Sequence, residues 1–194
     1  MKNLCTGVTS NSRTHKIQNQ SIFSFNDDET KIIVHSLSGI EKQVLTLGGI
    51  GAEMCVNGHF LAVSCVPTLL KIYDLSRREA KQLVHKDMAA MLPEIGQITN
   101  ISINSSGNRV AFLAEDQNGQ QDGVVYIYCP DRQKVHVHEI SQIDSRLTDS
   151  THDSISTSGI RGLLPVVVSW DEKDPKDRIF MFCVREFFII FWVF

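Results

Sequence analysis

Net charge of either sign is almost absent from this sequence. Its 194 residues carry 19 Lys and Arg against 22 Asp and Glu, which gives a formal net charge of −3. Because no surplus of cations spreads a positive field over the molecule, we expect no nucleic acid partner. No apolar run approaches the roughly 20 residues that a membrane-spanning helix needs, so we also expect no transmembrane segment.

Paired cysteines are lacking as well. The five cysteines are an odd number and include no CxxC pair. Cys55, Cys65 and Cys183 lie inside apolar runs, where a free thiol behaves as a small buried hydrophobe. These features favour a reducing compartment over a disulfide framework.

Catalytic and cofactor motifs are also missing. The patterns GxSxG, HExxH and GxxxxGK do not occur, and no GxGxxG follows a strand. The glycine cluster at 48–51 precedes no long helix, which favours a tight turn over a phosphate cradle. His136 and His138 would share one side of a strand, but without a Cys or carboxylate at ligand spacing they are expected to be solvated. We therefore predict no catalytic residue, cofactor, metal ion or small-molecule substrate.

Helical periodicity is scarce, and apolar residues come instead in short runs of about four to eight residues, as in strands. Tight turns are indicated between the runs, as at Asn57-Gly58 and Ser106-Gly107-Asn108. This pattern predicts an antiparallel all-β fold. The expected strands include Lys31–Leu37, Gln43–Leu47, Phe60–Val66, Leu69–Leu75, Ile98–Ile103, Arg109–Ala114, Val124–Cys129, Lys134–Ile140, Leu163–Ser169 and Arg178–Val184.

One segment and two loops interrupt the strand pattern. Asp87–Leu92 predicts one short helix that Asp87 caps and Pro93 ends. The stretches Glu115–Gly123 and Ser141–Gly159 are hydrophilic and are expected to be loops. We expect the second to be mobile, because it is rich in Ser, Thr and Asp.

An internal repeat indicates how the strands are organised. Three stretches align without gaps, namely Ile32–Gly39, Leu70–Arg77 and Val125–Arg132. Each precedes a second strand, and the later two also follow a strand pair around a tight turn. Four strands per unit is the blade of a β-propeller. Val34 and Ile72 are 38 residues apart, near the roughly 40–45 of a WD-type blade. A fourth unit begins at Leu163 and shows two strands.

The Trp-Asp signature of such blades is degenerate here. Tyr73-Asp74 occupies the place of the Trp-Asp pair at the end of a third strand. The literal Trp170-Asp171 follows a first strand and is therefore interpreted as a false match.

A mildly basic stretch is the one candidate for partner binding. It comprises Lys71, Arg77, Arg78, Lys81, His85 and Lys86. A solvated hairpin with weak ion pairs is the plainer interpretation. The alternative is a patch for an acidic partner, with Arg77, Arg78 and Lys81 as the partner-binding residues. A propeller-based hydrolase would need several acidic or His residues on the innermost strands, where the expected segments supply only Glu53.

Three segments carry a resemblance to a known family. DLSRREAK at 74–81, IGQITNISINSSGNRVAFL at 95–113 and SWDEKDPKDRIFMFCV at 169–184 resemble the second propeller of the intraflagellar transport protein 140 family. The resemblance implies a non-enzymatic scaffold in intraflagellar transport complex A, which supports retrograde ciliary transport and cilium assembly. It implies other complex A subunits as partners and the cilium and cytoplasm as locations. The alternative is a propeller of another trafficking or vesicle-coat complex.

The expected organisation follows from the repeat and the resemblance together. Residues 1–20 form an N-terminal segment that is expected to be partly disordered. Residues 21–184 form a partial WD-repeat-like β-propeller of about three four-stranded blades plus an incomplete one. Residues 185–194 form an apolar tail unlike the family, which suggests a partial open reading frame.

Overall fold

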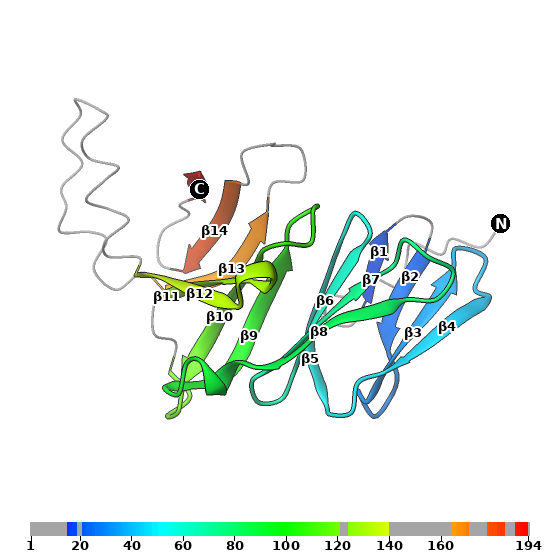
Figure 1. The fold of residues 1–194 in the computed structure, drawn as a ribbon, viewed down its shortest axis with the longest axis horizontal. Coiled ribbons are helices and arrows are strands. Elements are labelled where there is room, and N and C mark those ends of the chain that lie inside the picture. Colours follow the sequence, from blue (N-terminus) through cyan, green and yellow to red (C-terminus); the bar gives the residue numbers. More distant parts are fainter. Residues whose placement is uncertain are drawn as a thin grey trace.

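The described part of the chain is built almost entirely from strands (Figure 1). The computed structural model describes the backbone of residues 15–18, 21–120, 124–139, 164–170, 178–184 and 189–193, and within these ranges the side chains of residues 16, 21–120, 124–138 and 170. These residues form four antiparallel sheets.

Each sheet is a meander in which a strand pairs with the strand before it in the chain. The first sheet contains β1 (His15–Gln18), β2 (Ser21–Phe25), β3 (Lys31–Ser36) and β4 (Glu41–Thr46). The second contains β5 (Gly51–Asn57), β6 (Phe60–Cys65), β7 (Leu69–Asp74) and β8 (Lys81–Asp87). The third contains β9 (Ile95–Ile103), β10 (Val110–Asp116), β11 (Val124–Cys129) and β12 (Lys134–Glu139). The fourth contains β13 (Leu164–Trp170), β14 (Arg178–Val184) and β15 (Ile189–Val193).

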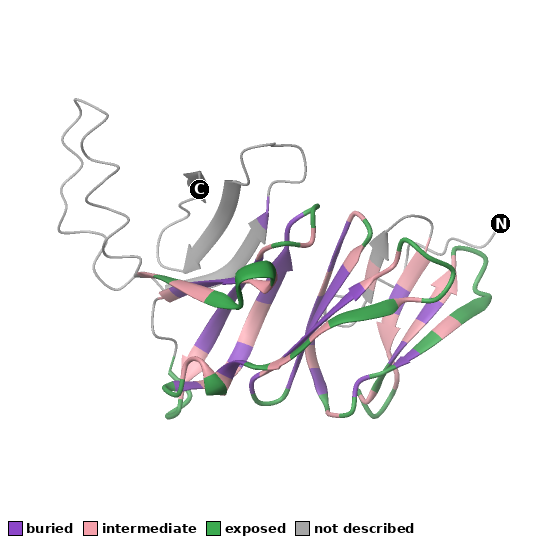
Figure 2. Ribbon diagram, viewed as in Figure 1, coloured by how far each residue is buried: buried purple, intermediate pink, exposed green. Residues whose placement is uncertain are grey.

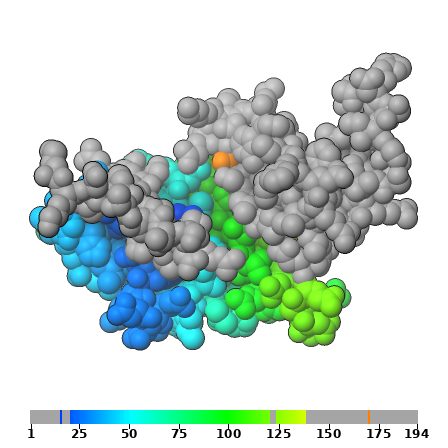
Figure 3. All heavy atoms as spheres, turned by 180° about the vertical axis from the view of Figure 1, so that it is seen from behind, coloured from blue at the N-terminus to red at the C-terminus, as the bar shows by residue number. Residues whose placement is uncertain are grey.

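The first strands of successive sheets lie side by side. β5 contacts β1 and β9, and β9 in turn contacts β13. The last strands of the first three sheets, β4, β8 and β12, are at the opposite edges. Seen from behind, these three sheets follow one another as blue, cyan and green bands (Figure 3). Four-stranded meanders that meet along their first strands are blades, so the chain is a partial β-propeller and the predicted fold is confirmed.

The alternation of side chains along β6 and β7 buries both faces of the second sheet. Leu61, Val63 and Tyr73 pack in a cluster with the first sheet, around Phe23 and Ile32. The intervening residues Ala62, Leu70 and Ile72 pack in a second cluster with the third sheet, around Phe112 and Tyr126. Buried residues therefore concentrate where the faces of neighbouring sheets pack together, whereas the last strands β4 and β8 expose many residues (Figure 2).

The turns between strands follow the predicted residues. Gly58 and Gly107 both have positive φ, +57° and +70°, a conformation that favours glycine over residues with a Cβ. The two turns belong to neighbouring sheets and meet there. A Cβ on Gly107 would lie 2.5 Å from the Phe60 ring, and one on Gly58 would lie 3.2 Å from the Ser105 carbonyl oxygen.

The predicted short helix is present as a 3₁₀ turn, η1 (Met88–Ala90). The Asp87 carboxylate accepts a hydrogen bond from the Ala89 amide at 3.0 Å, which confirms Asp87 as the cap. The Asp87 carboxylate also accepts from the Thr68 hydroxyl at 2.6 Å. These two hydrogen bonds hold the start of η1 against the second sheet, and the chain continues from η1 into the third sheet. A second 3₁₀ turn, η2 (Pro130–Arg132), was not predicted.

Two strands differ from the sequence analysis. The fourth unit has three strands where two were expected, because Ile189–Val193 pairs with β14 as β15. His15–Gln18 pairs with β2 as β1 and completes a four-stranded first blade. These strands lie within the segments assigned to the N-terminus and the tail. The predicted mobile loop, 141–159, falls outside the described residues.

The contact between the two turns can be measured with a pair of glycine substitutions. Gly39 has a φ of +83° and nothing within 4 Å of a Cβ, whereas Gly107 faces Phe60. We expect Gly39→Ala to cost about 1 kcal/mol of unfolding free energy from backbone strain. Gly107→Ala should cost about 2–4 kcal/mol, because the Phe60 ring must also move. Equal losses in urea denaturation would show that the two turns do not touch.

Candidate interaction surface

The predicted partner-binding residues lie at the turn between β7 and β8. Arg77 and Arg78 are exposed within this turn, and Lys81 is the exposed first residue of β8, opposite Asp74. Arg77 and Arg78 border a groove of about 420 Å³ between the first and second sheets. The groove is lined by Ser21, Phe23, Val34, Lys42, Gln43, Leu75, Arg77, Arg78 and Ala80. Lys81 does not line it. We call this feature the Arg77–Arg78 groove.

Hydrogen bonds fix the turn that carries the two arginines. The Asp74 carboxylate accepts from the Ser76 amide at 2.8 Å, and this bond holds the pKa of Asp74 below its ordinary value. The Leu75 amide donates to the His59 carbonyl oxygen at 2.7 Å. The Ala80 amide donates to the Gln43 side-chain oxygen on β4 at 3.1 Å. The turn is thereby bound to both sheets.

The floor of the groove is apolar and its rim is cationic. Phe23 and Val34 are only 3% and 7% exposed and belong to the core between the two sheets. Leu75 and Ala80 are partly buried against the same core. Lys42 is exposed on β4, and its ammonium donates to the Ser21 hydroxyl at 3.1 Å. The lining contains three cations and no carboxylate.

The depressed pKa of Asp74 predicts a pH dependence of stability. A carboxyl whose pKa is lower in the folded state stabilises the fold above its unfolded pKa, near 3.8, and this stabilisation is lost as the pH falls through the folded value. Asp74→Asn keeps an oxygen that can accept from the Ser76 amide but cannot ionise. We expect the wild type to melt above this variant at neutral pH and the difference to shrink as the pH falls below 3.8. A melting difference that is constant between pH 7 and pH 3 would contradict the assignment.

Lys71 was predicted in the solvated basic stretch, and this prediction is wrong. The side chain is only 3% exposed, because the alternation along β7 places residue 71 with Tyr73 on the face toward the first sheet. Its ammonium donates to the Leu47 carbonyl oxygen. The prediction failed because lysine is rarely buried without a partner, and the partner here is a backbone group that no sequence pattern marks.

Two other groups share this buried face. Burial raises the pKa of the Cys65 thiol, against an opposing effect of the Lys71 ammonium. Burial, together with Cys65, raises the pKa of Tyr73 to about 12. The Tyr73 hydroxyl has no hydrogen-bond partner among the described residues. Tyr73 and Asp74 lie at the end of β7, the third strand of the second sheet, as predicted. The Tyr73 hydroxyl, however, takes no part in a hydrogen-bond network among the described residues.

The buried lysine can be compared with an exposed one on the same hairpin. Lys71→Glu would place a carboxylate against the Leu47 carbonyl oxygen in an apolar interface. We expect a loss of at least about 3 kcal/mol of unfolding free energy, the scale of an uncompensated buried charge. Lys81→Glu makes the same charge change at an exposed position and should cost less than about 1 kcal/mol. Similar losses in the two variants would show that Lys71 is solvated.

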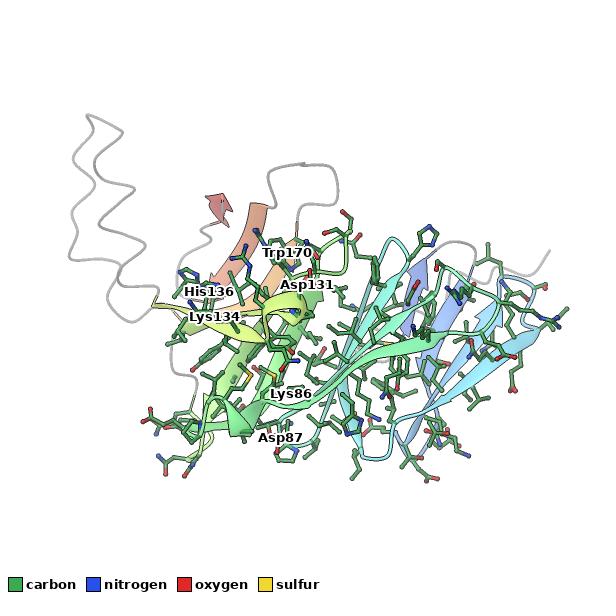
Figure 4. The ribbon with its side chains drawn as sticks, viewed as in Figure 1. Lys86, Asp87, Asp131, Lys134, His136 and Trp170 are labelled. Atoms are coloured by element: carbon green, nitrogen blue, oxygen red, sulfur yellow. The ribbon has the colours of Figure 1, made fainter. Side chains whose placement is uncertain are left out.

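Ser102 on β9 links three sheets. The Ser102 hydroxyl accepts from the Trp170 amide at 3.1 Å and lies 3.9 Å from the Cys55 sulfur on β5. The Ser102 carbonyl oxygen accepts from the Trp170 indole at 3.0 Å. Trp170 ends β13 and is 3% exposed where this strand meets β9 (Figure 4). Its position on a first strand confirms that Trp170-Asp171 is not the blade signature.

The two histidines do share one face of β12, as predicted. His136 lies opposite Ile127 and His138 opposite Val125. Both are half-buried and line a second groove of about 330 Å³ at the outer part of the third sheet. Figure 4 labels His136 on this strand. The other lining residues are Asn108, Arg109, Ile127, Cys129, Asp131 and Arg132. Among the residues with described side chains, no group of three His, Cys, Asp or Glu could hold a metal ion.

Comparison with known families gives one match over most of the chain. A family model described as "IFT140 second beta-propeller" matches residues 3–185. The match includes β1 through β14. None of the helices in the described part of the chain is long and apolar enough to span a membrane.

Solved structures show the same fold at low identity. The β-propeller domain of Cps50 (Swd1) from Myceliophteria thermophila is similar with a TM-score of 0.62 at 8% identity, over 94% of this chain and 53% of that one. A chain of the Mitotic Checkpoint Complex gives 0.58 at 11%, over 92% and 46%. The computationally designed Ika4 protein gives 0.53 at 11%, over 93% and 89%. The chain thus spans about half the length of the first two.

Proposed function

Because the chain belongs to the IFT140 second β-propeller family, we propose that it acts as a non-enzymatic scaffold of intraflagellar transport complex A. In this role it supports retrograde ciliary transport and cilium assembly through protein–protein contacts. Its partners are other subunits of that complex, and its locations are the cilium and the cytoplasm. The family match over residues 3–185 is the observation that carries the proposal.

The architecture supports a scaffold. The hydrogen-bonded meanders form a stiff framework, and the turns between their strands are where contacts with partners can vary. The turn that carries Arg77 and Arg78 is bonded to the first sheet through Gln43. A partner would therefore meet a surface that is already ordered, which lowers the entropic cost of binding.

The chemistry of the Arg77–Arg78 groove and of Glu53 supports a role without catalysis. The Arg77–Arg78 groove offers cations and apolar side chains, but its lining holds no Cys, His or carboxylate to act as nucleophile or general base. Glu53, the acidic residue considered for a hydrolase, is a buried residue on β5. Its amide donates to the Ser64 hydroxyl at 3.1 Å within the second sheet.

Affinity purification from ciliated cells tests the proposed function. The full 194-residue chain would carry a terminal tag, and captured proteins would be identified by mass spectrometry. We expect enrichment of intraflagellar transport complex A subunits and tag signal at cilia. Leu61→Asp is the control, because Leu61 is fully buried between the first and second sheets and the variant reports what a misfolded chain captures. Recovery of vesicle-coat subunits instead, or equal capture by the control, would contradict the proposal.

A further inference from the structure

We propose that the Arg77–Arg78 groove binds an acidic segment of a partner protein, with one apolar side chain of that segment seated on the groove floor. The inference rests on the proposed function in so far as the occupant is a protein. It adds the site and the chemistry of the contact.

The shape of the groove suits one anchored side chain. Its volume of about 420 Å³ lies within the roughly 300–1,000 Å³ of most ligand pockets. Phe23 and Val34 form the floor from the first sheet, and Leu75 and Ala80 add apolar surface from the second. An aliphatic or aromatic side chain would find apolar partners from both sheets, and its burial would be favourable in proportion to the area covered.

The charges around the groove floor favour a negatively charged occupant. Lys42, Arg77 and Arg78 are exposed at the rim, and no carboxylate lines the groove. The turn also carries two acidic residues, Asp74 and the exposed Glu79, and neither lines the groove. The Asp74 carboxylate accepts from the Ser76 amide. Arginine binds carboxylates through two parallel hydrogen bonds, so two adjacent arginines favour a segment with consecutive Asp or Glu residues.

The net charge of the chain argues for a local contact and against a polyanion. The molecule carries a formal charge of −3, so the three rim cations are not part of a positive field over the whole molecule. A nucleic acid or an anionic membrane binds through an extended positive field. A short acidic segment needs only the three cations and the apolar floor that the groove provides.

Lys81 offers a control that distinguishes binding in the groove from a general effect of the net charge. It belongs to the same hairpin and is exposed, but it does not line the groove. Lys134 is an exposed cation on β12 of the third sheet and does not line it either. Lys81→Glu/Lys134→Glu therefore changes the net charge by the same amount as Arg77→Glu/Arg78→Glu while leaving the groove lining unaltered.

Fluorescence anisotropy with a labelled peptide tests the inference on the full chain. The probe is a short peptide of glutamates around one central leucine, and two further probes replace the leucine by glutamine or every glutamate by lysine. We expect Arg77→Glu/Arg78→Glu to weaken binding of the first probe at least about tenfold, and the control double variant less than about twofold. The leucine-to-glutamine probe should bind several-fold more weakly, and the lysine probe should not bind. Added salt should reduce the arginine effect.

Equal weakening by the two double variants, or no binding of the acidic probe to the wild type, would overturn the inference. Melting curves verify that each variant is folded, and Arg77→Gln/Arg78→Gln replaces the charge reversal if that variant does not fold. Affinity purification with the same variants separates the two proposals. If Arg77→Glu/Arg78→Glu recovers complex A subunits as well as the wild type, the groove is wrong and the proposed function stands. If the wild type binds the probe but recovers no such subunit, the groove stands and the proposed function is wrong.

Discussion

Burial of the second sheet on both of its faces is the constraint that orders the rest of the structure. Alternate residues of β6 and β7 serve two different cores, one shared with the first sheet and one with the third. A shift of either strand by one residue would move each set of side chains into the core that fits the other set, Lys71 included. Lys71 is carried into the interface by the same alternation, and the Leu47 carbonyl oxygen accepts a hydrogen bond from its ammonium there.

The candidate groove forms because the first and second sheets pack together, and no local sequence motif encodes it. Phe23 and Val34 come from one sheet, and Arg77 and Arg78 come from a turn of the next. The Gln43 side chain and the Ala80 amide join the two contributions. Partner binding would thus depend on the free energy with which two blades associate, although none of the rim cations belongs to the core between them.

Much of the fold could be predicted because it depends on local sequence patterns. Short apolar runs and turn glycines such as Gly58 and Gly107 indicated the strands and hairpins. Asp87 was recognisable as the residue that caps η1. The candidate site could be predicted only in part. Arg77 and Arg78 were visible as a basic turn, but their groove partners on β2, β3 and β4 depend on which sheet faces meet. Lys71 and Lys81 were grouped with them by sequence proximity, but Lys71 is buried between two sheets and Lys81 does not line the groove.

The central claim is that the first strands of neighbouring sheets lie against one another. Cys55 on β5 and Ser102 on β9 test this most directly, because the sulfur and the hydroxyl oxygen are 3.9 Å apart. Ser102→Cys would bring two thiols within reach of a disulfide, which needs Cα atoms closer than about 7 Å. Peptide mass spectrometry after mild oxidation should find a 55–102 bridge within one chain, and no bridge from Cys55 in Ser106→Cys, which alters an exposed turn residue. Absence of the 55–102 bridge, or equal bridging in both variants, would contradict the blade arrangement.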